Sequence, residues 1–201
     1  MVYFRHAVLL LIAMAWTHGS KAQTSQPTAS ANSPEHTVRS LYRQVLVRAP
    51  SGLLDGANRR IFAPYLSQSL LRKIGTARAC EQDWFRQNRG RMEKAPFAWS
   101  EAGMFTGPNE RTYPGSFQIE SIKAEKDGSF RVMVSFAYRP SDGQGSWRVE
   151  DTAVQEDGRF VVNEVTFPAE RSESAYTLSQ RLSEGCKGPR WVGTRWHCPA
   201  L

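Results

Sequence analysis

The stretch that decides the fold is "FRVMVSFAYRPSDGQGSWRVEDTAVQEDGRFVVNEVTF", residues 130–167. Its first part alternates between apolar and other side chains, with the larger apolar set at Phe130, Val132, Val134, Phe136 and Tyr138. A period of two residues is typical of a β-strand with one buried face. Asp-Gly pairs accept the positive φ angles of tight hairpin turns, and they occur at 127–128, 142–143 and 157–158. We therefore predict an antiparallel meander with strands over 117–125, 129–139, 146–155 and 159–167.

A helical pattern begins well before this meander. Ser33 is a good N-cap and Pro34 fits the first helical position, so a helix is predicted from there to a point before Pro50. Its apolar face consists of Val38, Leu41, Tyr42, Val45 and Leu46. Residues 49–60 are predicted to form a loop, because glycine and proline punctuate them.

A second helical region is predicted to begin near Ser67. Its apolar stripe steps by three or four residues through Leu70, Ile74, Ala77, Cys80 and Trp84. Gly75 leaves open whether the region is one helix or two. Residues 94–115 lack a period and read as mostly loop, with room for one short strand at 102–105. A last helix is predicted over 172–184, with Ala175, Leu178 and Leu182 on one face.

This element order predicts an α+β domain. A curved antiparallel meander of about four to five strands is expected to pack against the N-terminal helices and a closing C-terminal helix. The domain is assigned to residues 33–193, followed by a tail over 194–201.

The first 22 residues have the layout of a secretory signal peptide. Arg5 and His6 precede an apolar run over 7–16, and small residues at Ser20 and Ala22 define a cleavage site. The run is too short for a transmembrane helix, which needs roughly 20 apolar residues. We expect cleavage near Ala22 and export to the periplasm or the medium. Residues 23–32 are then expected to be a disordered linker.

Charge and histidine content argue against several functional classes. Loss of Arg5 and Lys21 lowers the formal net charge from +7 to +5, and the basic residues form no run or aromatic-basic stripe typical of nucleic-acid binding. The processed chain has only two histidines, His36 and His197, and no paired spacing typical of a metal site. No metal, cofactor or nucleic-acid partner is therefore expected.

Six segments along the chain carry a family pattern: "VRSLYRQVL", "FAPYLSQSLL", "ACEQDWF", "GMFTGPNE", "GRFVVNEVTF" and "LSEGCKGPRWVG". In these segments the protein resembles bacterial secreted proteins of the domain of unknown function 3828 family. That resemblance implies a fold similar to nuclear transport factor 2-like cones, in which a curved antiparallel sheet wraps against helices. It implies no established activity, because the wider cone fold includes isomerases, dehydratases, ligand binders and pure interaction modules.

Three cysteines, Cys80, Cys186 and Cys198, follow the cleavage site. A disulfide is the default in an exported chain, and three pairings are open. We favour Cys80–Cys186, because both residues lie beside predicted packed elements and within segments of the family pattern. A nucleophilic role for Cys80 is disfavoured, because it lies on the apolar stripe and its acidic neighbours oppose thiolate formation.

Two acids in the last hairpin, Asp151 and Glu164, are weak catalytic candidates. A two-residue turn at 157–158 places Ala153 opposite Val162 and Asp151 opposite Glu164. Two facing acids favour a shared proton or a raised pKa, as in functional carboxylates. A one-residue bulge would instead place Asp151 opposite Asn163.

A loop over 107–113 is a second candidate site, with Asn109, Glu110, Arg111 and Tyr113 as its polar and aromatic side chains. We favour a rigid connector over a ligand- or partner-binding loop, because glycine and proline already account for its sequence. The sequence as a whole favours a non-enzymatic envelope domain that binds a protein or a small molecule. The alternatives are an isomerase- or hydratase-type enzyme with Asp151 or Glu164 as general base, and an envelope inhibitor or immunity-type protein.

The cysteine assignment predicts the result of a peptide map. A digest of the exported protein under nonreducing conditions is expected to contain a peptide that joins Cys80 to Cys186, and mass spectrometry would detect it. A peptide that joins Cys186 to Cys198 would contradict the assignment.

Overall fold

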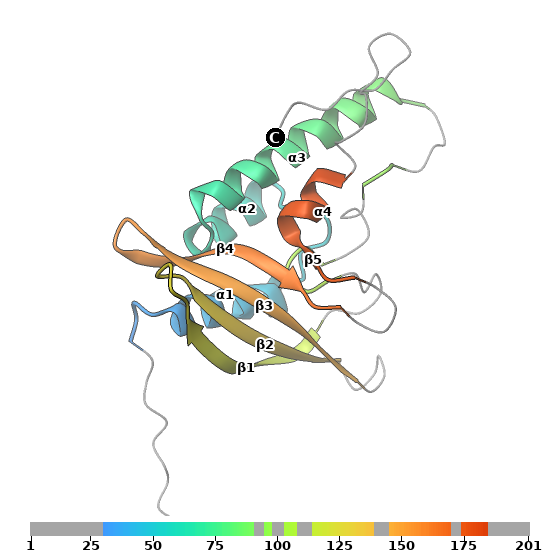
Figure 1. Ribbon diagram of the computed structural model, residues 1–201. Helices are drawn as coiled ribbons and strands as arrows, with labels where there is room; N and C mark the ends of the chain where they lie inside the picture. The colour runs from blue at the N-terminus through green and yellow to red at the C-terminus, as the bar shows by residue number, and fades with distance from the viewer. Residues whose placement is uncertain are drawn as a thin grey trace, which may run out of the picture.

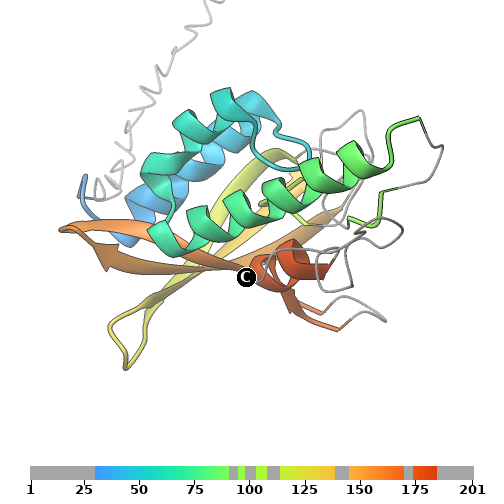
Figure 2. The same ribbon diagram turned by 90° about the horizontal axis from the view of Figure 1, so that it is seen from above.

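The structure is a computed structural model that describes residues 30–90, 95–97, 103–107, 114–138, 145–169 and 174–184. One curled antiparallel sheet lies beneath a layer of helices, and a short helix closes the chain's described part (Figure 1). Seen from above, the helices lie on one side of the sheet (Figure 2). The predicted α+β class is confirmed.

The sheet has five strands in the order of the chain, as a meander requires. Asp157 and Gly158 both have positive φ, 51° and 75°, as a tight two-residue hairpin needs. Gly128 also has a positive φ, at 83°, whereas the pair at 142–143 lies outside the described residues. The strands are β1 (Pro114–Ala124), β2 (Phe130–Tyr138), β3 (Ser146–Glu156), β4 (Arg159–Phe167) and β5 (Tyr176–Thr177).

The two long predicted helices are present. Helix α1 (Pro34–Arg48) begins where the Ser33 hydroxyl accepts a hydrogen bond from the His36 backbone N–H, 3.1 Å away. Helix α3 (Gln68–Gln87) is continuous, so Gly75 does not divide it. The five predicted stripe residues of α3 are all buried, which confirms that this face of the helix, with Cys80, turns inward.

Two local predictions for segments that precede the sheet were wrong. Part of the predicted 49–60 loop is helix α2 (Gly56–Phe62), where the Asp55 carboxylate accepts from the Asn58 N–H at 2.7 Å; a turn of 3₁₀-helix, η1 (Ala63–Tyr65), follows. The turn over 103–107 replaces the predicted short strand. Both α2 and this turn are too short to produce a detectable hydrophobic period.

The last helix, α4 (Leu178–Glu184), is shorter than predicted because Tyr176 and Thr177 pair with β4. Thr177 and Gln180 form reciprocal side-chain-to-backbone hydrogen bonds at the helix start. Such a capping box satisfies N–H groups that have no helical partner, and it sets the start of α4 after the strand.

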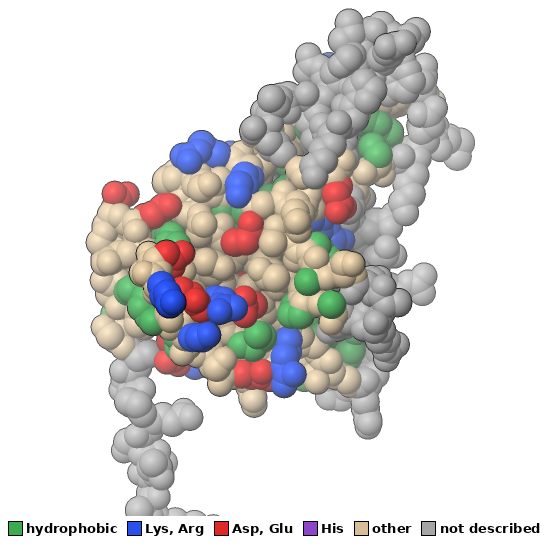
Figure 3. Space-filling model, in the orientation of Figure 1, with side chains coloured by type: hydrophobic (Ala, Val, Ile, Leu, Met, Phe, Trp, Pro, Cys, Tyr) green, Lys and Arg blue, Asp and Glu red, His purple; other side chains and the backbone are tan. Residues whose placement is uncertain are grey.

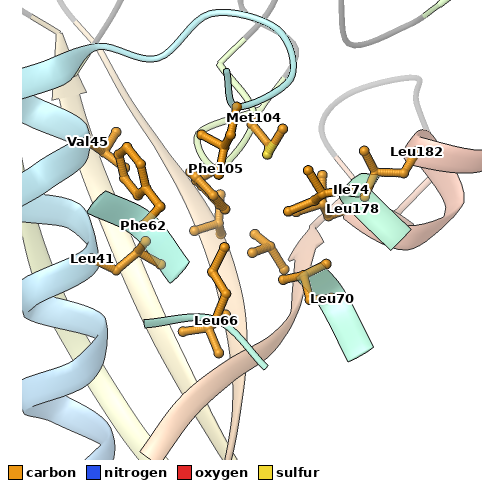
Figure 4. Close-up of a cluster of buried hydrophobic side chains, with 14 of the residues drawn as sticks. Leu41, Val45, Phe62, Leu66, Leu70, Ile74, Met104, Phe105, Leu178 and Leu182 are labelled. Carbon is orange, nitrogen blue, oxygen red and sulfur yellow. The ribbon is translucent and has the colours of Figure 1, made fainter. Parts of the chain in front are cut away.

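The hydrophobic core lies between the sheet and the helices. Side chains from α1, α2, α3, α4 and the 103–107 turn converge there (Figure 4). Figure 4 labels Leu41, Val45, Phe62, Leu66, Leu70, Ile74, Met104, Phe105, Leu178 and Leu182. The opposite face of β1–β3 faces the viewer in Figure 1 with no described helix over it. We call this surface the open sheet face.

Gly75 provides a test of the α3 packing. Gly75→Ala is expected to raise the free energy of unfolding by about 0.5–1 kcal/mol, because alanine has the higher helix propensity. A Cβ there would approach only the end of the Arg59 side chain, at 3.9 Å. Gly128→Ala is the opposite control, because its φ of +83° strains an alanine. Urea denaturation measures the free energy of unfolding of both variants, which should rise for Gly75→Ala and fall for Gly128→Ala. A decrease for Gly75→Ala would contradict the open space seen beside Gly75.

Candidate functional site

Asp151 is an acid in the protein core. It lies on β3 among the inward-facing residues Trp147, Val149 and Ala153, and its exposed fraction is 0%. The Tyr42 hydroxyl, on the inner face of α1, lies 3.0 Å from Asp151 Oδ1. Asp151 Oδ2 has no hydrogen-bond partner among the described residues. A buried acid with one unsatisfied oxygen is the first candidate site.

The hairpin register separates Asp151 from Glu164. Ala153 lies opposite Val162 as predicted, but Asp151 lies opposite Val165 and Glu164 lies opposite Thr152. Both predicted partners of Asp151 were wrong. A β-bulge places one extra residue, Asn163, in β4, and this shifts the pairing of the residues beyond it.

The β4 bulge coincides with the start of α3. Ser67 Oγ lies 2.8 Å from Asn163 Oδ1, and the Ser67 N–H donates to the Val162 carbonyl at 2.9 Å. The same hydroxyl caps α3 by accepting from the Leu70 N–H. Contacts between segments distant in sequence thus stabilise the bulge.

Glu164 contacts two helices and is not paired with Asp151 between the strands. Its Oε1 accepts from the Ser179 N–H of α4 at 3.1 Å, and its Oε2 lies 4.0 Å from the Lys73 ammonium of α3. The carboxylate therefore links β4 to two helices. The two acids do not form the facing pair that would share a proton.

Burial dominates the electrostatics of Asp151. It raises the pKa of this carboxyl from 3.8 to about 8; the hydrogen bond from Tyr42 opposes the rise and the neighbouring Glu150 adds to it. Burial, and then Asp151 itself, raises the pKa of Tyr42 well above 10.0. Both side chains are therefore mostly neutral at neutral pH, and Asp151 is protonated.

The protonated acid changes how the hydrogen bonds are arranged. Tyr42 has one hydroxyl proton, and its oxygen also lies 3.4 Å from the Phe105 carbonyl. A neutral Asp151 can donate to Tyr42, which then donates to Phe105. The Tyr42 ring packs against Phe136 and Phe117, at 5.0 and 5.7 Å between centroids. The pair can thus supply a proton donor in an apolar setting, whereas an uncharged acid is a poor general base.

A shallow cleft on the open sheet face is the second candidate site. It encloses about 120 Å³ and is lined by Ser121, Lys123, Arg131, Met133 and Glu150. In this view of the molecule, basic and acidic side chains alternate over the strands (Figure 3). The sequence reasoning missed this cleft, although Arg148 and Glu150 occupy alternate, outward positions of β3.

Ion pairs connect the strands around the cleft. Arg131 Nε lies 2.6 Å from Glu125 Oε1, and its Nη1 lies 3.9 Å from Glu150. Arg148 Nε lies 2.8 Å from Glu120 Oε2. The first pairing lowers the pKa of Glu125 and raises that of Arg131, chiefly through their hydrogen bond. The cleft therefore has fixed charges of both signs on a rigid sheet.

Several predicted positions lie outside the described residues: Asn109, Glu110, Arg111, Tyr113, Cys186 and Cys198. The Cys80–Cys186 disulfide therefore stays a prediction. The described residues contain no group of three or more His, Cys, Asp or Glu that could hold a metal ion. In the part of the chain that is described, no helix has the length and apolarity to span a membrane.

No protein-family model matches the sequence, and a comparison with curated proteins finds no match.

The raised pKa of Asp151 predicts a specific pH dependence of stability. Between about pH 4 and 8 the folded protein retains a proton that the unfolded chain has released. Below this pH range the neutral carboxyl makes its full contribution to the free energy of unfolding, and that contribution is lost as pH rises through the range. The stability of the wild type relative to Asp151→Asn should fall by about 1.4 kcal/mol per pH unit between about pH 5 and 7, as measured by urea denaturation.

Tyr42→Phe is the matched control. It retains the acid and removes only the hydroxyl, so the pH dependence should persist while the free energy of unfolding drops by about 1–3 kcal/mol at acidic pH. An unchanged pH dependence in Asp151→Asn would show that Asp151 is not the titrating group.

Proposed function

We propose that this protein is an exported, non-enzymatic binding domain of the bacterial cell envelope, and that its open sheet face contacts a protein partner. The cleft at Lys123, Arg131 and Glu150 carries the proposal. It is exposed on strands with no described helix over them, and it has fixed charges of both signs. Such charges set the register and specificity of a protein contact.

The size of the cleft favours a protein partner over a small molecule. Its volume of about 120 Å³ is well below the roughly 300–1,000 Å³ of typical ligand pockets. A space of this size accommodates one side chain of a partner. An envelope inhibitor or immunity-type protein is one form of this proposal.

The second candidate function is an isomerase- or hydratase-type enzyme, favoured by the buried Asp151 and its raised pKa. In this candidate, the neutral Asp151 and Tyr42 would donate hydrogen bonds to a substrate oxygen. Both side chains have an exposed fraction of 0%, so a substrate would have to displace the packing around them. For this reason we rank the enzyme hypothesis below the binding-domain hypothesis.

A matched pair of charge reversals tests the open sheet face. Lys123→Glu and Lys126→Glu make the same change three residues apart on exposed positions, but only Lys123 lines the cleft. We expect a tagged protein isolated from the native envelope to lose its bound partner upon Lys123→Glu and to retain it upon Lys126→Glu. Quantitative mass spectrometry of the eluates measures the recovery.

Two results would contradict the proposal. One is equal recovery of every bound protein with the two variants. The other is turnover of a carbonyl or hydroxy compound by the purified protein that Asp151→Asn abolishes while circular dichroism shows a folded variant, which would favour the enzyme instead.

A further inference from the structure

The charges of this protein are divided between its two layers. Residues 34–90, which include α1, α2 and α3, contain ten arginines and lysines and four acids. Residues 114–138 and 145–167, which include strands β1–β4, contain five basic residues and eight acids. The helical layer thus carries an excess of six positive charges, while the sheet has an acidic excess. The modest net charge of the whole chain does not reveal this unequal distribution of charge between the two layers.

The acids of the helical layer do not neutralise its excess. Glu35 pairs with Arg39 at 2.6 Å, and Asp83 pairs with Arg86. Asp55 caps the start of α2. Six arginines of the helical layer make neither an ion pair nor a side-chain hydrogen bond with a described residue: Arg43, Arg48, Arg59, Arg60, Arg72 and Arg89.

The unpaired arginines include a group on the α2–α3 pair. Arg59 and Arg60 are exposed on α2, and Arg72 is exposed on α3. The Arg59 guanidinium reaches across to α3, within 3.9 Å of the Cβ position at Gly75. In Figure 3, basic side chains are visible on the upper surface of the molecule, where the helical layer lies. We call Arg59, Arg60 and Arg72 the arginine patch.

The helical layer also bears exposed apolar side chains. Val47, near the end of α1, is 76% exposed, and Phe85, near the end of α3, is 54% exposed. Three large apolar side chains are exposed among the described residues, and these two lie on the positive layer. Basic groups without ion-pair partners bind the surface of an anionic bilayer, and exposed apolar side chains add to that binding where they reach the same surface.

The chemistry of guanidinium favours phosphate as the binding group. Its planar donors bind phosphate oxygens in a bidentate manner, which a lysine ammonium cannot do. Five of the unpaired groups lie on three helices, α1, α2 and α3, rather than within one groove. A surface that presents many phosphates at once therefore matches this layer better than a single anionic side chain does.

We propose that the helical layer docks onto a bilayer of anionic phospholipids through the arginine patch. The acidic excess of the sheet then orients the molecule, because it is repelled from the same surface. This proposal does not rest on the proposed protein partner, since it concerns the opposite layer of the molecule.

Vesicle co-sedimentation of the exported, processed protein tests the proposal. The probes are vesicles of phosphatidylglycerol and phosphatidylcholine in equal parts, and vesicles of phosphatidylcholine alone. We expect binding to the first kind only, with affinity that falls as salt rises. The triple change Arg59→Gln, Arg60→Gln and Arg72→Gln should weaken it roughly a hundredfold, at about fivefold per arginine.

The matched control removes three positive charges from the sheet layer, with Lys123→Gln, Lys126→Gln and Arg159→Gln. It has the same net charge as the triple variant and should bind the anionic vesicles almost as well as the wild type. If the triple variant unfolds in a thermal melt, the double change Arg60→Gln and Arg72→Gln replaces it, with an expected loss of about twenty-five-fold. Equal weakening by helix and sheet variants would overturn the proposal, as would tighter binding to polyglutamate than to the anionic vesicles.

Discussion

Helix α1 lies across the inner face of the sheet and contacts all four of its long strands. Its buried side chains, Val38, Leu41, Tyr42 and Val45, provide the surface around which the sheet curls. Every inward position of β2 and β3 must therefore fit against that helix or its neighbours. Asp151 occupies one such position, and burial there favours its neutral form, hydrogen-bonded to Tyr42. The unusual acid is thus a consequence of how the helix and the sheet meet.

The same packing gives the two outer surfaces their different characters. Helices that bury their apolar stripes against the sheet present their arginines to solvent, whereas the open sheet face presents short-range pairs of opposite charge. A surface of unpaired like charges attracts extended polyanions, and a surface of paired charges favours a partner with matching geometry. A protein with both surfaces can hold a partner at a defined distance and orientation from a membrane.

Periodic segments were predictable and local exceptions were not. The alternation of β2, the start of β4 after the Asp157-Gly158 turn and the start of α1 at Ser33 and Pro34 were predictable, because those patterns are local. The Asn163 bulge depends on Ser67, almost a hundred residues away in sequence, so hairpin rules alone gave the wrong partner for Asp151. Tyr42 looked like one more core aromatic, and nothing local indicates that its hydroxyl meets a buried acid. The cleft was missed for a related reason: its residues come from three strands.

The position of α1 also affects how the protein acquires its structure. Chains are synthesised from the N-terminus, so α1 appears first, while its last sheet partner ends at Phe167. Until then part of its native contact surface is missing, and an isolated helix of 15 residues is only marginally stable in water. The domain therefore cannot complete its core before most of the chain is available. Under the proposed export, in which the chain crosses a membrane pore unfolded, late completion of the core would keep the chain unfolded until it has crossed.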